Sequence, residues 1–295
     1  MANLPPLLQN LMNLERLENN LFRGDSWDLG FRALFGGQVL GQSLIAATET
    51  VADDRLCHSY HSYFLLPGDA NIPVIYDVES VREGGSFSTR RVKAIQNGKN
   101  IFYMTASFQI AEDNLSHQFA EMPKVPSETE ILSDVEFYQQ NPNLISAGMR
   151  AAMDYHAVID LRSVNGINPY SKNKSQPLKQ VWFRATEALN DDQRLNQSIL
   201  AYASDFHFLG TALQPHGVAV TDPKLRIATI DHAIWFHKSV QMNEWHLYSM
   251  ESPYSGNARG LVNGKIFDKQ GDLVASTIQE GLVRLNNKGY QCNIN

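Results

Sequence analysis

Residues 36–50 read GGQVLGQSLIAATET, and residues 58–68 read HSYHSYFLLPG. The first stretch predicts a helix because two glycines precede a run of good helix formers. Its apolar side chains recur near helical spacing, at Val39, Leu40, Leu44 and Ala47. The second stretch predicts a strand because it is short, rich in aromatic residues and closed by a Pro-Gly turn. One helix followed by a strand is therefore the start of the pattern.

The same half continues with strand-like runs at 73–84, 87–99 and 101–109. These runs are rich in aromatic and β-branched residues and are separated by Gly-Gly and Asn-Gly turns. The Asn97-Gly98 pair is a strong hairpin signal. The first half thus predicts one helix and an antiparallel meander.

Residues 111–150 are polar, contain prolines and show no sustained hydrophobic period, which predicts a linker with one short helix. Beyond it, residues 191–210 predict a second helix, with Asp191 and Asp192 near its positive N-terminal end. The other runs beyond the linker have strand character, at 156–164, 179–185, 228–238, 244–256, 258–272 and 273–285.

The two halves match piece by piece. Gln42-Ser43-Leu44 aligns with Gln197-Ser198-Ile199, and HSYFLLP with HAIWFHK. Thr89-Arg90 aligns with Ala258-Arg259, and Asn97-Gly98 with Gln270-Gly271. An internal repeat of about 110 residues follows, in two copies and not in the three or more that a solenoid needs. One helix wrapped by an antiparallel sheet, twice in tandem, predicts an α+β double hot-dog fold. Its N-terminal half is expected at 1–115, a linker at 116–150 and its C-terminal half at 151–295.

Composition narrows the class of protein. Hydrophobic residues make up 43% and charged residues 19%, the balance of a globular enzyme. A net charge of -6 argues against general nucleic-acid binding. No run reaches the roughly 20 apolar residues of a membrane helix, and the N-terminus has no basic start typical of a secretory signal. Two cysteines without a Cys-x-x-Cys motif favour a reducing compartment, so we expect a cytoplasmic protein that does not enter membranes.

Eight ordered segments resemble the acyl-CoA thioesterase II (TesB-like) family. They include LFRGDSWDLGFRALFGGQVLGQSL (21–44), YASDFHFLGTALQPHG (202–217), IATIDHAIWFH (227–237) and LVASTIQEGLVR (273–284). The others are at 58–69, 76–99, 101–109 and 243–260, so the segments span nearly the whole chain apart from roughly residues 111–175. The resemblance implies hydrolysis of fatty acyl-CoA, with medium to long chains as the expected range. It also implies pairing of chains into dimers or tetramers.

In that family a water molecule attacks the thioester. It is held by an Asp on the second helix, a Thr at the start of a strand and a Gln on the last strand. By position, the resemblance implies Asp205, Thr229 and Gln279 here. An acid in an apolar segment such as that around Asp205 is costly to bury, and burial raises its pKa towards the range of a general base. The first half has no matching Asp and has Ala106 in place of Gln279, so we expect one site per chain.

Each of the three residues also has a structural alternative. Asp205 would be a helix-end residue bonded to the backbone. Thr229 would be a strand residue favoured by β-propensity alone. Gln279 would be a core amide with satisfied hydrogen bonds. The absence of a Gly-x-Ser-x-Gly motif supports direct attack by water, which requires neither a cofactor nor a metal.

A metal site formed by Asp231, His232 and His237 is one hypothesis, but the geometry of a strand argues against it. Side chains alternate along a strand, so His232 and His237 are expected on opposite faces, bonded to backbone or neighbouring groups. His58 is the next candidate for catalysis, with a pocket-lining or strand-bonded histidine as the alternative.

Local cations are the candidates for binding the CoA phosphates: Arg90, Arg91 and Lys93 in the first half, Arg259 and Lys265 in the second. The alternative is ordinary solvated charge on strands. Gly36 and Gly37 open a helix whose first N–H groups suit an anion or a carbonyl oxygen, although a tight turn also explains them.

Two other functions remain open at this point. A hot-dog hydratase or dehydratase would need a histidine and an acid at a helix entry. A module that binds acyl-CoA without hydrolysing it would be favoured if one of Asp205, Thr229 and Gln279 were missing, and all three are present.

Overall fold

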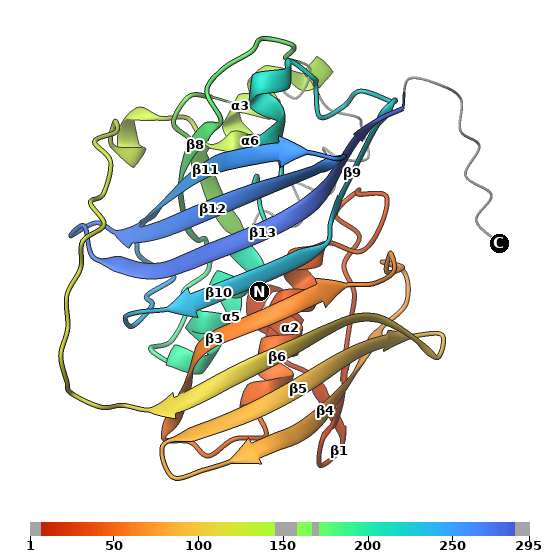
Figure 1. The fold of residues 1–295 in the computed structure, drawn as a ribbon, viewed down its shortest axis with the longest axis vertical. Coiled ribbons are helices and arrows are strands. Elements are labelled where there is room, and N and C mark those ends of the chain that lie inside the picture. The colour runs from red at the N-terminus through yellow and green to blue at the C-terminus, as the bar shows by residue number, and fades with distance from the viewer. Residues whose placement is uncertain (1–6, 145–157, 167–170, 287–295) are drawn as a thin grey trace, which may run out of the picture.

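The computed structural model describes residues 7–144, 158–166 and 171–286 (Figure 1). The first half consists of α1 (Leu7–Met12), β1 (Glu15–Glu18), β2 (Leu21–Gly24), α2 (Gly36–Thr48), β3 (Arg55–Phe64), β4 (Val74–Glu83), β5 (Phe87–Gln96) and β6 (Lys99–Ile110). The connection contains α3 (Asp134–Gln140) between 3-10 turns at Glu128–Glu130 and Pro142–Leu144.

The second half follows the same plan. Its elements are β7 (Ile159–Ser163), β8 (Leu178–Ala185), α5 (Gln193–Ala203), α6 (Gly210–Leu213), a 3-10 turn at Gln214–His216, β9 (Leu225–Thr229), β10 (Asp231–Phe236), β11 (His246–Gly256), β12 (Arg259–Asp268) and β13 (Leu273–Leu285). The predicted strand at 273–285 is confirmed to the residue.

One continuous antiparallel sheet joins the halves in the order β1-β2-β4-β5-β6-β3-β10-β13-β12-β11-β8-β7, with β9 paired to β13. Outwards from the junction of the two halves, the strands β3-β6-β5-β4-β2-β1 of the first half correspond one to one with β10-β13-β12-β11-β8-β7 of the second. The strands at the junction are β3 and β10, whose sequences align in the repeat, and they pair with Ser62 opposite His232. The predicted α+β class and tandem duplication are confirmed. The boundaries at 115 and 150 stay predictions.

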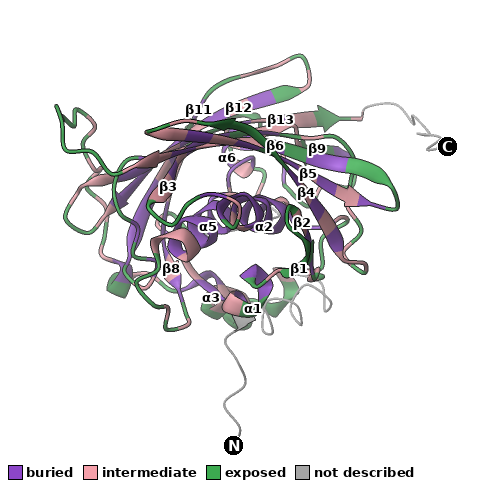
Figure 2. Cartoon of the chain, turned by 90° about the horizontal axis from the view of Figure 1, so that it is seen from below, coloured by how far each residue is buried: buried purple, intermediate pink, exposed green. Residues whose placement is uncertain are grey.

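The two long helices lie side by side within the curve of the sheet (Figure 2). α2 is buried on nearly every side, and its polar residue Gln42 is satisfied: Nε2 donates to Leu11 O and Asp25 O, while Tyr76 donates to Oε1. A Cβ at Gly41 would lie 2.9 Å from Ser198 O of α5. Glycine at this position therefore allows the two helices to approach closely.

The equivalent helices begin differently. α5 is capped by Asp192, whose Oδ1 accepts from Arg194 N at 2.9 Å, as its acidic N-terminal residues lead one to expect. α2 follows Phe35 and has no side-chain cap. Its first N–H groups therefore remain available to partners elsewhere in the fold.

Two predicted elements have different bounds. The helix expected at 191–210 ends at Ala203, because a turn follows in which His207 adopts a left-handed φ of 62°. The strand expected at 228–238 is interrupted at Ile230. From Thr229 to Ala233 the chain runs four residues, against three from Ile278 to Gly281 on β13, so the extra residue forms a bulge.

Within the described ranges, no helix combines the length and the apolar character that crossing a lipid bilayer requires.

Candidate active site

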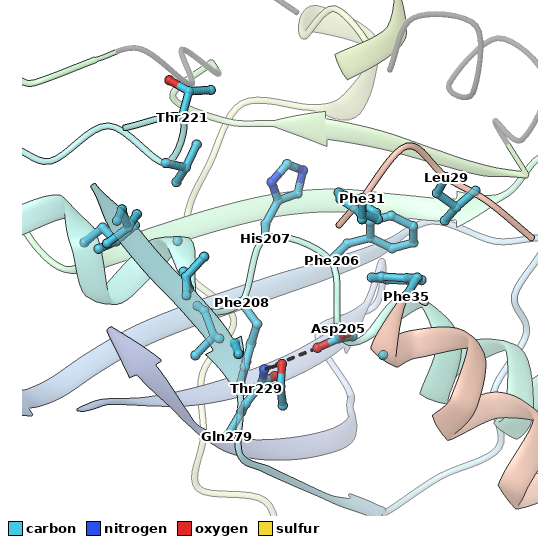
Figure 3. Close-up of a pocket in the computed structure, with 18 of the residues that line it drawn as sticks. Leu29, Phe31, Phe35, Asp205, Phe206, His207, Phe208, Thr221, Thr229 and Gln279 are labelled. Carbon is cyan, nitrogen blue, oxygen red and sulfur yellow. Dashed lines mark hydrogen bonds between the residues drawn. The ribbon is translucent and has the colours of Figure 1, made fainter. Parts of the chain in front are cut away.

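A cavity of about 1980 Å³ opens beside the start of α2. Both halves contribute to its wall. Phe35, Gly36 and Phe64 come from the first half, while the turn after α5, strand β9 and Gln279 of β13 come from the second. Figure 3 shows the close-up of this wall. Because the wall crosses the junction, the cavity depends on the tandem arrangement.

Three polar side chains meet at the wall. Gln279 Nε2 donates to Asp205 Oδ1 at 3.2 Å and to Thr229 Oγ1 at 2.7 Å (Figure 3). The Thr229 oxygen already accepts from Gln279, so its own hydrogen is left to donate to the Asp205 carboxylate. The structure thus brings together the three residues implied by the family resemblance.

Local structure explains how each one reaches the wall. Asp205 lies in the turn just beyond α5, and not within the helix as predicted. Thr229 is the last residue of β9, and not the first of a strand, because the bulge at Ile230 follows it. Asp231 closes that bulge by accepting from Glu280 N at 2.8 Å. Gln279 points inwards by the ordinary alternation of a strand and is 1% exposed.

Burial dominates the electrostatics of Asp205 and raises the pKa of its carboxyl to about 7. Hydrogen bonds from Gln279, the Gly37 backbone and Thr229 lower the pKa and offset part of that rise. The Asp205 side chain still faces the cavity, where it is partly exposed. Near neutral pH, this carboxyl can therefore accept a proton and later return it.

Gln279 carries a second signal. Its Oε1 is buried and has no hydrogen-bond partner within the described part of the chain. A buried amide oxygen without a partner is costly, and such groups are concentrated at functional sites. The amide is thus a candidate for contact with a molecule in the cavity.

The start of α2 faces this carboxylate. The Gly37 N–H donates towards Asp205, and a Cβ at Gly36 would lie 2.6 Å from Asp205 Oδ2. Gly36 lines the cavity, whereas Gly37 contacts the backbone of α5 at Tyr202. The double glycine therefore provides close approach to both the acid and the neighbouring helix.

The histidines predicted on opposite faces of the strand do separate. His232 is fully buried, and His237 is exposed and contacts Ser276 Oγ at 2.9 Å. Ser204 Oγ donates to Ala201 O, so His232 Nε2–H donates to Ser204 Oγ at 3.1 Å and Nδ1 accepts from Tyr60 at 3.2 Å. His232 thereby ties the turn that bears Asp205 to the first half. Burial lowers the pKa of His232 to about 3, so the ring is neutral.

The other predicted site residues lie off the cavity wall. His58 Nε2 contacts Ser107 Oγ at 2.8 Å on β6, in keeping with the strand-bonded alternative. Arg90, Arg91 and Arg259 pair with Glu83, Glu79 and Glu280 respectively. Arg90 is 3% exposed and also bonds to Thr50. Phosphate binding by these three arginines stays a prediction.

Several wall residues were not singled out from the sequence. The cations Arg32, Lys179 and Arg226 line the cavity. Aromatic rings flank Asp205, with Phe35 and Phe206 centroids 4.5 Å apart and Phe31 5.6 Å from Phe35. Asp134, at the start of α3, and His207 also line the cavity. Of these wall residues, only Asp134 is next to a local sequence signal. Ser133 and Glu136 form a capping box, which marks the start of α3 at Asp134.

Comparisons with known proteins agree with one another. The family described as "Acyl-CoA thioesterase" matches residues 146–282, and the "Acyl-CoA thioesterase N-terminal domain" matches 24–109. Acyl-CoA thioesterase 2 of Haemophilus influenzae is 40% identical over 279 residues, covering 95% of this chain and 97% of its own. The structure of the thioesterase II TesB2 from Mycobacterium marinum has 38% identity and a TM-score of 0.77, covering 95% and 99%.

A more distant structure confirms the fold. A protein with a hot dog fold from Alicyclobacillus acidocaldarius shares 18% of residues, with a TM-score of 0.75, over 94% of this chain and 97% of its own. The predicted double hot-dog architecture is thereby confirmed.

Proposed function

The chain belongs to the acyl-CoA thioesterase family, and from that premise we propose that it hydrolyses fatty acyl-CoA by direct attack of water on the thioester. The observation that carries the proposal is the meeting of Asp205, Thr229 and Gln279 at the cavity wall. The reaction releases the fatty acid and CoA.

Asp205 is the proposed general base. As water attacks the acyl carbon, its proton passes to the carboxylate and a tetrahedral oxyanion forms. Collapse breaks the C–S bond, and the proton then returns to the leaving thiolate. A carboxyl with a pKa of about 7 suits both transfers near neutral pH. Thr229 and Gln279 orient the water and hold the carboxylate.

The proposed oxyanion donor is the Gly36 N–H at the start of α2, because the Gly37 N–H already donates to Asp205. Support comes from the uncapped start of this 13-residue helix, which places partial positive charge beside Asp205. Gln279 contributes a second dipole to the same corner of the cavity.

Medium to long acyl chains are the proposed substrates. A volume of about 1980 Å³ exceeds the ~1,000 Å³ upper range of ordinary small-ligand pockets. The aromatic and aliphatic wall, which includes Leu29, Phe31 and Phe35, suits an alkyl chain. Arg32, Lys179 and Arg226 are cations on the same wall and suit the phosphates of CoA.

We also propose a homo-oligomer, because the sheet ends in two edge strands, β1 and β7, of the kind that further pairing protects. The free, buried thiol of Cys57 fits a reducing compartment, and the cytoplasm is the proposed location.

The test is release of free thiol from acyl-CoAs of graded chain length, with wild type and Asp205→Asn side by side. Turnover by the wild type and its loss in the variant, with folding intact, is the expected result. Comparable rates in both would remove Asp205 from its role. A protein that binds acyl-CoA without turnover would support the binding-module alternative.

The hydratase alternative has a separate readout, which is water addition to an enoyl-CoA without thiol release. His207 is the histidine of the cavity wall among the described residues, and both of its ring nitrogens already have partners. It is therefore poorly placed to serve as the base of a hydratase.

A further inference from the structure

The turn that bears Asp205 ends in a strained residue. His207 has a φ of 62°, a left-handed conformation that glycine and asparagine adopt more readily than histidine. It lies two residues beyond Asp205, after Phe206, which packs on Phe35. A strained conformation persists only where surrounding contacts enforce it, and such positions are concentrated at functional sites.

The contacts of the His207 ring supply that enforcement. Nε2 lies 2.7 Å from Asp134 Oδ2, and Nδ1 lies 3.3 Å from Lys179 Nζ. A single neutral tautomer satisfies both: Lys179 donates to Nδ1, and the Nε2–H donates to Asp134. A second proton on the ring would place Nδ1–H against the Lys179 amine, and burial together with Lys179 lowers the pKa of His207.

Asp134 is itself anchored. The Ser163 backbone N–H of β7 donates to its Oδ1 at 3.2 Å, and the Asp134 side chain is 6% exposed. Asp134 is the first residue of α3, in the connection between the halves, while Lys179 lies on β8. Two separate elements, α3 and β8, therefore converge on one ring at the wall of the cavity that Asp205 lines, and β7 anchors Asp134.

We propose that Asp134, His207 and Lys179 are positioning residues of the active site, which lock the turn 204–207 and so hold Asp205 against Thr229 and Gln279. The proposal rests on the role of Asp205 given above. It makes α3 part of the catalytic apparatus and not merely a connection. Neither nitrogen of His207 is free to exchange protons with substrate, so the ring acts through the backbone of the turn.

The test is His207→Gly, because glycine accepts the left-handed φ and removes only the ring contacts. We expect kcat to fall about 10- to 100-fold, the loss typical of a misplaced catalytic group, with little change in KM. A misplaced Asp205 loses hydrogen bonds that lower its pKa, so the acid limb of the kcat/KM profile should move to higher pH. His207→Asn, which also tolerates this φ, and Asp134→Ala should behave alike.

Asn97→Gly is the matched control, since Asn97 also has a positive φ, of 49°, but lies in the β5–β6 hairpin turn away from the cavity. It should leave kcat and the pH profile unchanged. Wild-type kcat in folded His207→Gly would overturn the proposal, as would a fall in kcat with an unmoved acid limb, which indicates a general structural role.

Asp205→Asn, assayed in parallel, distinguishes a failure of the positioning role of His207 from a failure of the catalytic role of Asp205. Loss of turnover in Asp205→Asn together with full activity in His207→Gly would overturn only the positioning role. Full activity in Asp205→Asn would overturn both.

Discussion

Asp205→Asn should make the protein more stable at alkaline pH while it lowers the rate of catalysis. Burial raises the pKa of this carboxyl from 3.8 to about 7. Between those values the folded protein holds a proton that the unfolded chain releases. Wild-type stability therefore falls as pH rises from about 4 to about 7 and stays at the lower level above it. The amide variant has no such dependence at this position.

The size of the effect follows from the shift. From pH 5 to pH 7 it amounts to two pH units at about 1.4 kcal/mol each, or about 3 kcal/mol at most. Solvent that reaches Asp205 from the cavity reduces this, so we expect about 1 to 3 kcal/mol. Loss of a general base lowers the rate by about 10²- to 10⁴-fold.

The assay is urea unfolding of both proteins at pH 5 and pH 8, with thiol release measured at pH 8. The free energy of unfolding of the variant, relative to wild type, should rise by that amount between the two pH values. Because the two proteins are compared at each pH, other titrating groups cancel. An equal difference at pH 5 and pH 8 would show that Asp205 is not held at a raised pKa, and the argument for a neutral-pH base would fail.

Three further outcomes are expected. The acid limb of kcat/KM should have its midpoint near pH 7, since Asp205 must be ionised to accept a proton; a midpoint near pH 4 would point to an unburied carboxyl. Gln279→Glu places a second carboxylate beside Asp205, and repulsion between the two should raise the pKa of Asp205. In pH–rate profiles the acid limb of kcat/KM should therefore move to higher pH, and kcat should fall. An acid limb that does not move would contradict the contact between the two side chains. Gly41→Ala introduces a Cβ 2.9 Å from Ser198 O and 2.6 Å from the Met12 methyl. This overpacking should lower the free energy of unfolding by about 1–3 kcal/mol, as measured by urea titration. Unchanged stability would mean that α2 and α5 separate easily.

Periodicity and turn chemistry predicted much of the fold. The strand 273–285 is recovered in full because it is an uninterrupted run after a turn, and its inward and outward residues alternate from Ala275 to Gly281. The helix at Gly36–Thr48 and the Asn97-Gly98 turn are also local in origin. The break at Ile230 was not predictable in this way, because a bulge depends on register with β13. The end of α5 was not predicted for a related reason: the turn that follows contains the left-handed His207, whose ring contacts Asp134, 73 residues away in the sequence.

The residues of the candidate site also differ in how far the sequence predicted their place in the structure. Resemblance selected Asp205, Thr229 and Gln279, and the structure brings them together, while their catalytic role is a proposal. Local charge selected Arg90, whose carboxylate partner Glu83 lies on the neighbouring strand β4. Pairing across strands is not readable from the residues around a cation, so charge alone was a poor guide to the cavity wall.

The two helices of the repeat begin in opposite ways, one closed by Asp192 and the other open at Gly36. In a symmetric pair of identical chains, any such choice would appear twice, and both helix ends would be open or both closed. Joining the copies in one polypeptide frees each to take a different task. One copy supplies the helix end and the other supplies the acid, so the proposed site requires both halves of the chain.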